Sequence, residues 1–192
     1  TMTSYGYPVI KDKTSFALVP MNPAIIPAVK ASANKHIGVI ATEATIKKGM
    51  HKQAASNLDP QIKVFGVGCP KFVPLIETGH IHDDAIDEAV QEYADKFKTS
   101  DIHSLILGCT HYPIISEVLT KHFGKDVALI NPALETAKDA ATILTKNNLL
   151  NTQGKQLLAD ATKTMASLEQ TSAILNKLLK ENQGSINNGL QG

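Results

Sequence analysis

Residues 37–41 read IGVIA, a short apolar run that is followed directly by polar loop residues. Three further runs of this kind come later in the chain: IKVFGV at 62–67, LILG at 105–108 and VALI at 127–130. Apolar runs of about four to eight residues, bounded by turn and loop residues, are typical of strands that are buried on both faces. We therefore predict a strand at each of these positions.

Stretches of helical length separate and follow these runs. They are amphipathic and cover residues 45–56, 83–98, 114–123 and 134–146. The alternation of strands and helices predicts an α/β fold, with an open, mostly parallel sheet and helices on both faces. Ligands of such sheets bind beyond the carboxyl ends of the strands, so we expect a site in the loops that follow the strands.

The two ends of the chain show other patterns. We predict a short extra strand at 16–19 and a linker at 20–27, where three prolines fall close together. A long helix is predicted at 155–180, with an apolar stripe typical of a core or an interface. The expected organisation is an N-terminal extension or linker at 1–20, an α/β domain at 21–147, a helical segment at 148–180 and a disordered tail at 181–192.

Composition excludes several classes of function. Hydrophobic residues make up 43% and charged residues 19% of the chain, and no apolar run approaches the roughly 18 residues of a membrane span, so we expect no membrane partner. Basic residues number 19 against 18 acidic ones and are scattered, which argues against nucleic acid. The first residues lack a signal-peptide pattern, so we expect a cytoplasmic protein. Because the cytoplasm is reducing, we expect its two cysteines, Cys69 and Cys109, to be free thiols.

The loop after the third predicted strand carries reactive side chains. Cys109 lies in GCTHYP at 108–113, and Pro113 marks the expected start of a helix, where backbone N–H groups and the helix dipole favour a thiolate. His111 can pair with the thiol or relay a proton, and Thr110 can donate a hydrogen bond to a carboxylate. The alternative is that Cys109 is a buried packing residue, because free cysteine is among the most buried residue types.

Four strings resemble sequences of the glutamate racemase family. LGCTHYP at 107–113 is similar to the signature around the second catalytic cysteine of that family. The strings IGVIATEATI at 37–46, CPKFVPLIETG at 69–79 and VALINPALETA at 127–137 agree with the family in order and spacing, so the resemblance covers about residues 20–147. It implies a cofactor-independent isomerase that interconverts L- and D-glutamate and supplies D-glutamate for peptidoglycan. It also implies that this fold is one half of a pseudo-symmetric enzyme.

The resemblance implies roles for the residues of the Cys109 loop. In the family, two thiols face opposite sides of the substrate α-carbon, and one removes the proton while the other returns one. By resemblance, Cys109 is the base that acts on the L enantiomer, Thr110 contacts the substrate and His111 handles the proton. A thiol suits this work because its ordinary pKa of about 8.5 lets it act as base and as acid near neutral pH.

Three residues outside that loop also match the family. Glu77 resembles the acidic residue near the family's site, with a solvated carboxylate at a helix end as the alternative. Thr42 and Thr45 resemble the loop that hydrogen-bonds the substrate carboxylate or amine. For these two threonines the alternative is a helix N-cap, since threonine before a helical run commonly caps it.

The sequence also departs from the family. In the family, the first catalytic thiol lies in an A-C-N-T string and the enzyme opens with a D-S-G-x-G-G string. Neither string occurs in these 192 residues. Cys69 falls in a string whose cysteine is not an acid/base residue in the family, and LLADATKTM at 157–165 stands where an aromatic strand is expected. Because one half alone leaves apolar surface exposed, we expect a homodimer or a complementing N-terminal half as partner. The resemblance implies glutamate as the substrate.

Two other functions stay open at this point. One is a non-catalytic binding or assembly module that kept the fold and its anion-binding loop. The other is a one-thiol relative, such as a decarboxylase of the same superfamily, which protonates a carbanion from one face. The remaining histidines show no metal-ligand spacing, so we expect neither metal nor cofactor, and HIHDD at 80–84 is interpreted as a solvated helix start.

Overall fold

The computed structural model describes residues 2–149, 153–154, 156, 159–160 and 163–164. The chain divides into two compact units, residues 1–140 and 141–192, and the α/β fold belongs to the first unit. The predicted helix at 155–180 falls mostly, and the predicted tail at 181–192 entirely, outside the described residues.

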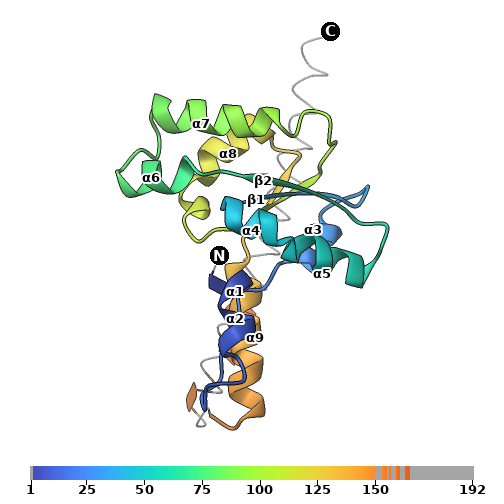
Figure 1. Ribbon diagram of the computed structural model, residues 1–192, viewed down its shortest axis with the longest axis vertical. Coiled ribbons are helices and arrows are strands. Elements are labelled where there is room, and N and C mark those ends of the chain that lie inside the picture. The colour runs from blue at the N-terminus through green and yellow to red at the C-terminus, as the bar shows by residue number, and fades with distance from the viewer. Residues whose placement is uncertain (1, 150–152, 155, 157–158, 161–162, 165–192) are drawn as a thin grey trace. The chain divides into compact units, whose positions relative to one another are not determined.

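Parallel strands form a single four-stranded sheet in the order β2–β1–β3–β4, which confirms the predicted fold class (Figure 1). Every strand begins and ends within one residue of its predicted position. Their bounds are β1 (His36–Ala41), β2 (Lys63–Gly68), β3 (Ser104–Leu107) and β4 (Ala128–Ile130). The central strands β1 and β3 are almost completely buried, as their unbroken apolar sequences require.

Helices cover both faces of the sheet, as predicted (Figure 1). On one face, Ile40, Leu105 and Leu107 belong to an apolar cluster with α6 (Phe72–Glu77), α7 (Asp84–Asp95) and α8 (Ser116–Phe123). On the other face, Val39 and Ile106 pack with α3 (Ile25–Lys30) and α5 (Met50–Leu58). Alternate residues of one strand thus serve opposite clusters, because successive side chains of a strand point to opposite faces.

Two predicted helices differ in detail from those of the structure. The predicted helix at 45–56 is two helices, α4 (Glu43–Lys48) and α5, separated by Gly49 with φ of 72°. Glycine adopts this left-handed conformation without the steric cost of a side chain, and so ends α4. The predicted helix at 114–123 starts with a 3-10 turn, η1 (Tyr112–Ile115), before α8. The last helix with continuous bounds in the described residues is α9 (Ala133–Lys146).

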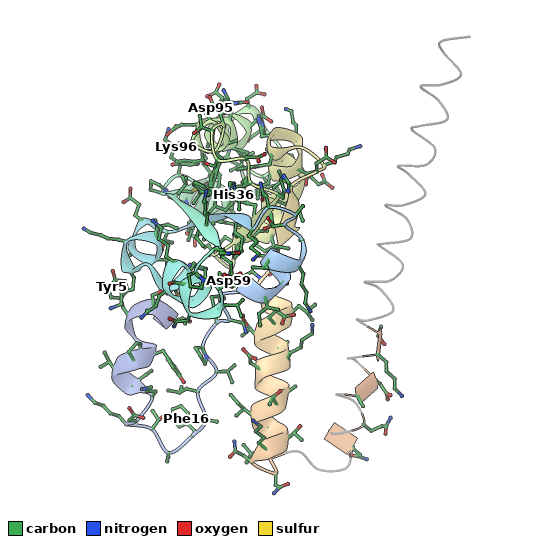
Figure 2. The ribbon with its side chains drawn as sticks, turned by 90° about the vertical axis from the view of Figure 1, so that its right-hand side faces the viewer. Tyr5, Phe16, His36, Asp59, Asp95 and Lys96 are labelled. Carbon is green, nitrogen blue, oxygen red and sulfur yellow. The ribbon has the colours of Figure 1, made fainter. Side chains whose placement is uncertain are left out.

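The strand predicted at 16–19 is wrong. These residues form no ladder, and the side chain of Phe16 is 66% exposed on the loop between α2 and α3 (Figure 2). Pro20 follows this run directly and has no N–H, so it offers no donor that would extend a ladder beyond Val19. The segment before it forms two short helices, α1 (Met2–Tyr5) and α2 (Tyr7–Ile10), and α3 shortens the predicted linker.

Loops from three neighbouring strands begin at one edge of the sheet. The N–H of Gly108 donates to the carbonyl oxygen of Ile40 at 2.8 Å, and that of Cys69 donates to Ala41 at 2.9 Å. The ladder therefore continues one residue beyond β2 and β3. Thr42, Cys69 and Cys109 follow at the carboxyl ends of adjacent strands, where open α/β sheets bind their ligands.

Gly108 lies so close to β1 that a side chain there should destabilise the fold. A Cβ on Gly108 would lie 3.0 Å from both the carbonyl oxygen of Ile40 and the Cβ of Ala41. Because β1 is fixed between two strands, we expect Gly108→Ala to lower the free energy of unfolding by about 1–3 kcal/mol in urea titrations. Gly66→Ala is the control, since a Cβ there approaches only side-chain carbons of Ile46. Equal losses in both variants would contradict this account.

Candidate active site

A cavity of about 370 Å³ lies at the carboxyl ends of β1 and β3. Its wall combines the N-terminal segment, the start of α4 and α5, and the loop after β3. The lining in the described part of the chain includes no Lys, Arg, Asp or Glu. Its polar and reactive side chains are Thr3, Ser4, Asn22, Thr42, Thr45, His51, Cys109, Thr110 and His111.

Cys109, His111 and Glu77 form a chain of three functional groups. The Sγ atom of Cys109 lies 3.8 Å from Nδ1 of His111, and Nε2 of the same ring lies 3.2 Å from Oε1 of Glu77. An ionised carboxylate beside Nε2 favours the tautomer with its hydrogen on that nitrogen, and in that tautomer Nδ1 can accept the thiol proton. A nucleophile or base beside an imidazole that a third group orients is a recurring catalytic arrangement.

Packing between α6 and η1 explains why Glu77 and His111 meet. Tyr112 is fully buried, and its hydroxyl donates to the carbonyl oxygen of Cys69 at 3.1 Å. Its ring packs edge-on against Phe72 at 5.1 Å between centroids. These contacts fix the loop after β3 against the start of α6. Glu77 ends α6 and its side chain is 61% exposed, so it is both a helix-end carboxylate and a neighbour of His111.

The helix predicted to start at Pro113 begins with a 3-10 turn that leads into α8, which weakens the predicted effect of a helix dipole at Cys109. The turn spans four residues, and its N–H groups are partly engaged in internal hydrogen bonds. The N–H of Tyr112, for example, donates to the carbonyl oxygen of Cys109 at 3.2 Å. A turn of this length has no extended row of aligned peptide dipoles. The ring of His111 is therefore the group beside Cys109 that can handle its proton.

Thr42 is an N-cap, and it also lines the cavity. Its Oγ1 accepts from the N–H of Thr45 at 3.4 Å, which confirms the capping alternative at the start of α4. The hydroxyl of Thr42 also donates to Oγ1 of Thr45 at 3.0 Å. Both side chains line the cavity together with Thr110, Cys109 and His111. Glu77 reaches this group through His111 without lining the cavity itself.

The comparison with known proteins decides the family. A model of the Asp/Glu/hydantoin racemases matches residues 1–140. The chain belongs to this racemase family. The glutamate racemase of Lactiplantibacillus plantarum is 32% identical over 175 residues, which are 91% of this chain and 64% of that protein. That of Bacillus cereus is 37% identical over 131 residues, 68% of this chain and 49% of the relative. The chain thus spans about half to two thirds of these relatives.

Solved structures of the racemase family share the fold. A glutamate racemase from Bacillus anthracis superimposes with a TM-score of 0.72 at 30% identity, covering 78% of this chain and 57% of that one. The glutamate racemase of Francisella tularensis, solved in complex with D-glutamate, gives a TM-score of 0.70 at 32% identity, covering 79% and 56%. The parallel sheet with helices on both faces is therefore the fold of this family.

In this member of the racemase family, Cys69 lies outside the cavity. Its side chain is 1% exposed, and it packs in the apolar cluster with Phe72 and Tyr112. Burial raises the pKa of the Cys69 thiol far above its usual range, because a thiolate there would lose its hydration. Cys69 therefore has the position of a packing residue.

His51 lines the cavity although no sequence pattern singled it out. It lies in α5 and is 7% exposed, and Cε1 of its ring is 3.6 Å from where a Cβ on Gly108 would lie. Burial lowers the pKa of His51 to about 4, because the imidazolium form would be desolvated. The ring is therefore neutral near neutral pH. The turn at Gly49, which redirects the chain into α5, was the feature that could have indicated a buried position.

The described residues offer no metal site and no membrane-spanning helix. No group of three or more His, Cys, Asp or Glu side chains among them could hold a metal ion. Asp83 caps α7 by accepting from the N–H of Ile86 at 3.3 Å and pairs with His80, as expected of a solvated helix start. No helix of this part of the chain is both long and apolar enough to cross a membrane.

Cys109 should react with iodoacetamide faster than Cys69. Cys109 is half-buried at the cavity with His111 beside it, whereas Cys69 is buried and its raised pKa disfavours the thiolate that attacks the reagent. Timed alkylation of the folded chain, read residue by residue by mass spectrometry, gives both rates. Equal or reversed rates would remove the argument for a reactive Cys109.

His51 should make the fold sensitive to acid. Its pKa falls from 6.5 in the unfolded chain to about 4 in the folded one, so between these values the unfolded chain binds more protons. The free energy of unfolding should therefore decrease as the pH falls from 6.5 to 4, by about 3 kcal/mol from this residue. His51→Gln should remove that part of the pH dependence in denaturant titrations. A variant that loses stability as steeply as the wild type would contradict this assignment.

Proposed function

We propose that this chain carries one catalytic wall of a glutamate racemase, with Cys109 as one of the two thiols that exchange the substrate α-proton. The observation that carries the proposal is the row Cys109–His111–Glu77 at a cavity of ligand size. Two facts support the choice of substrate. The relatives in the comparison are glutamate racemases, and the Francisella tularensis structure holds D-glutamate.

The geometry suggests a sequence of proton transfers. The thiol of Cys109 passes its proton to Nδ1 of His111, and the carboxylate of Glu77 stabilises the positive charge of the resulting imidazolium. The thiolate then takes the α-proton of glutamate. The C–H bond breaks, an S–H bond forms and the electron pair stays on the α-carbon next to the carboxylate. Return of a proton to that carbon completes the exchange.

The cavity suits a small amino acid that is held by neutral donors. Its volume of about 370 Å³ falls within the roughly 300–1,000 Å³ of small-molecule sites. We assign Thr110, Thr42 and Thr45 to contacts with the substrate carboxylates and amine, since hydroxyl groups both donate and accept hydrogen bonds. The lining in the described residues carries no Lys or Arg, so neutral groups would supply these contacts.

Inversion needs a proton donor on the opposite face of the α-carbon. Cys109 is the one cysteine that lines the cavity within the described residues. We therefore assign the second thiol to a polypeptide segment outside these 192 residues, a complementing N-terminal half. Thiols that work as acids and bases must stay reduced, which fits the cytoplasm, where D-glutamate would enter peptidoglycan synthesis.

A one-thiol reaction is the second candidate, because a single thiol faces the cavity in the described part. Such an enzyme would protonate a carbanion from one face and would never invert the α-carbon. A non-catalytic module that only binds the ligand is the third candidate. Proton exchange and inversion, measured separately, distinguish the three functions.

The chain alone should exchange the α-hydrogen of L-glutamate in heavy water without forming D-glutamate, because one thiol removes and returns a proton on one face only. Proton NMR follows the exchange and chiral chromatography follows the inversion. Adding a separately made N-terminal half of a glutamate racemase should then produce D-glutamate. Exchange that never leads to inversion favours the one-thiol reaction, and the absence of both with the added half favours the binding module.

Two cysteine variants serve as controls for this experiment. Cys109→Ser should abolish exchange while it changes the free energy of unfolding by no more than about 1–2 kcal/mol, because the replacement is nearly isosteric. Cys69→Ala should leave exchange in place. If the chain alone converts L- to D-glutamate and Cys69→Ala stops the conversion, Cys69 is the second base and its assignment as a packing residue is wrong.

A further inference from the structure

Several hydrogen-bond donors around the cavity are already used within the protein. The hydroxyl of Thr42 donates to Thr45 at 3.0 Å, and that of Ser4 donates to the sulfur of Met50 at 2.9 Å. The side-chain amide of Asn22 donates to Asp139 at 2.8 Å. A ligand with carboxylate groups therefore depends on the donors that these internal bonds leave available.

His51 keeps its hydrogen-bonding capacity for a ligand. Its ring makes no hydrogen bond to any residue in the described part of the chain. In that same part, the Oγ of Ser104 is the single side-chain polar atom that is both fully buried and without a hydrogen-bond partner. The ring nitrogens of His51 also lack a partner there, so they cannot be fully buried and must retain accessible surface. On a side chain that is 7% exposed, such surface has to face a cavity.

Two spaces beside the ring are defined by described residues, and one of them can hold a substrate. His51 borders a small void of about 10 Å³, which it shares with Gly49 and Lys52. That volume is at the lower limit for one water molecule, roughly 10–15 Å³. The other space is the cavity of about 370 Å³ that His51 lines together with Cys109 and Thr110.

We propose that His51 is a substrate-positioning residue whose ring donates a hydrogen bond to a carboxylate oxygen of the ligand bound beside Cys109. The proposal rests on the proposed function of this cavity as the site of an amino-acid dicarboxylate. The described lining holds no Lys or Arg, so neutral N–H and O–H groups are needed beside His111 to bind the carboxylates of such a ligand. A neutral imidazole always keeps one N–H donor.

The position of the ring gives this hydrogen bond a role beyond affinity. His51 packs against Gly108, the residue directly before Cys109. A carboxylate held by His51 is therefore fixed relative to the thiol, and correct placement of the reacting carbon is a large part of catalysis. The low pKa of His51 agrees with this role, because the neutral ring donates without adding a second cation beside His111.

The test compares two replacements of His51 in the full chain. We expect His51→Leu, which removes the N–H, to weaken the binding of L-glutamate in calorimetry by about tenfold or more, as for a hydrogen bond to a charged group. His51→Gln keeps a donor and should stay within about threefold of the wild type. His82→Gln is the matched control, because His82 is exposed, pairs with Glu117 and does not line the cavity.

Nuclear magnetic resonance of the ring nitrogens supplies a second measurement that needs no variant. Addition of glutamate to the wild-type chain should shift the ring N–H of His51 together with the signals of Thr110 and His111. If Thr110 and His111 respond while His51 does not, and His51→Leu binds like the wild type, the role of His51 is overturned and the glutamate site stands. If no lining residue responds to glutamate, the glutamate site and the role of His51 are both overturned.

Discussion

The parallel pairing of β1 with β3 is the constraint on which the site depends. Ile40 lies opposite Leu107 in this pair, and the bond from Gly108 to the carbonyl oxygen of Ile40 carries the ladder one residue further. Because Gly108 has no side chain, the two strand ends approach closely and their loops open into one cavity. The threonines at the start of α4 and the thiol of Cys109 face the same space for this reason.

Burial separates the titratable groups of this chain into packing residues and residues that line the cavity. Cys69 and Tyr112 are enclosed in the apolar cluster, where burial raises the pKa of both, so they hold two loops together and stay protonated. Cys109 and His111 remain half-buried at the cavity, within reach of a ligand and of the carboxylate of Glu77. The packing residues thus fix the reactive ones in place while the cavity supplies access.

The sequence predicted the positions of the strands well, because apolar runs of strand length indicate burial directly. It also indicated that Cys109, Thr110 and His111 lie together in one loop at the sheet edge, because these residues are consecutive. It missed α3 and α6, since helices of six residues are too short to show a helical period. The resemblance indicated Glu77, yet its contact with His111 depends on the packing of Tyr112 against Phe72, which is a tertiary feature. His51 was missed because its burial depends on tertiary packing of α5 beside Gly108, 57 residues further along the chain.

The position of the ring hydrogen of His111 is the central claim, because a hydrogen on Nε2 leaves Nδ1 to accept the thiol proton of Cys109. Long-range proton–nitrogen correlation spectra of the ring measure it directly. This account predicts a hydrogen on Nε2, facing Glu77, both in the wild type and in Cys109→Ser. A ring whose only hydrogen is on Nδ1, with Nε2 bare, would contradict it, because His111 would then be unable to accept the proton of Cys109.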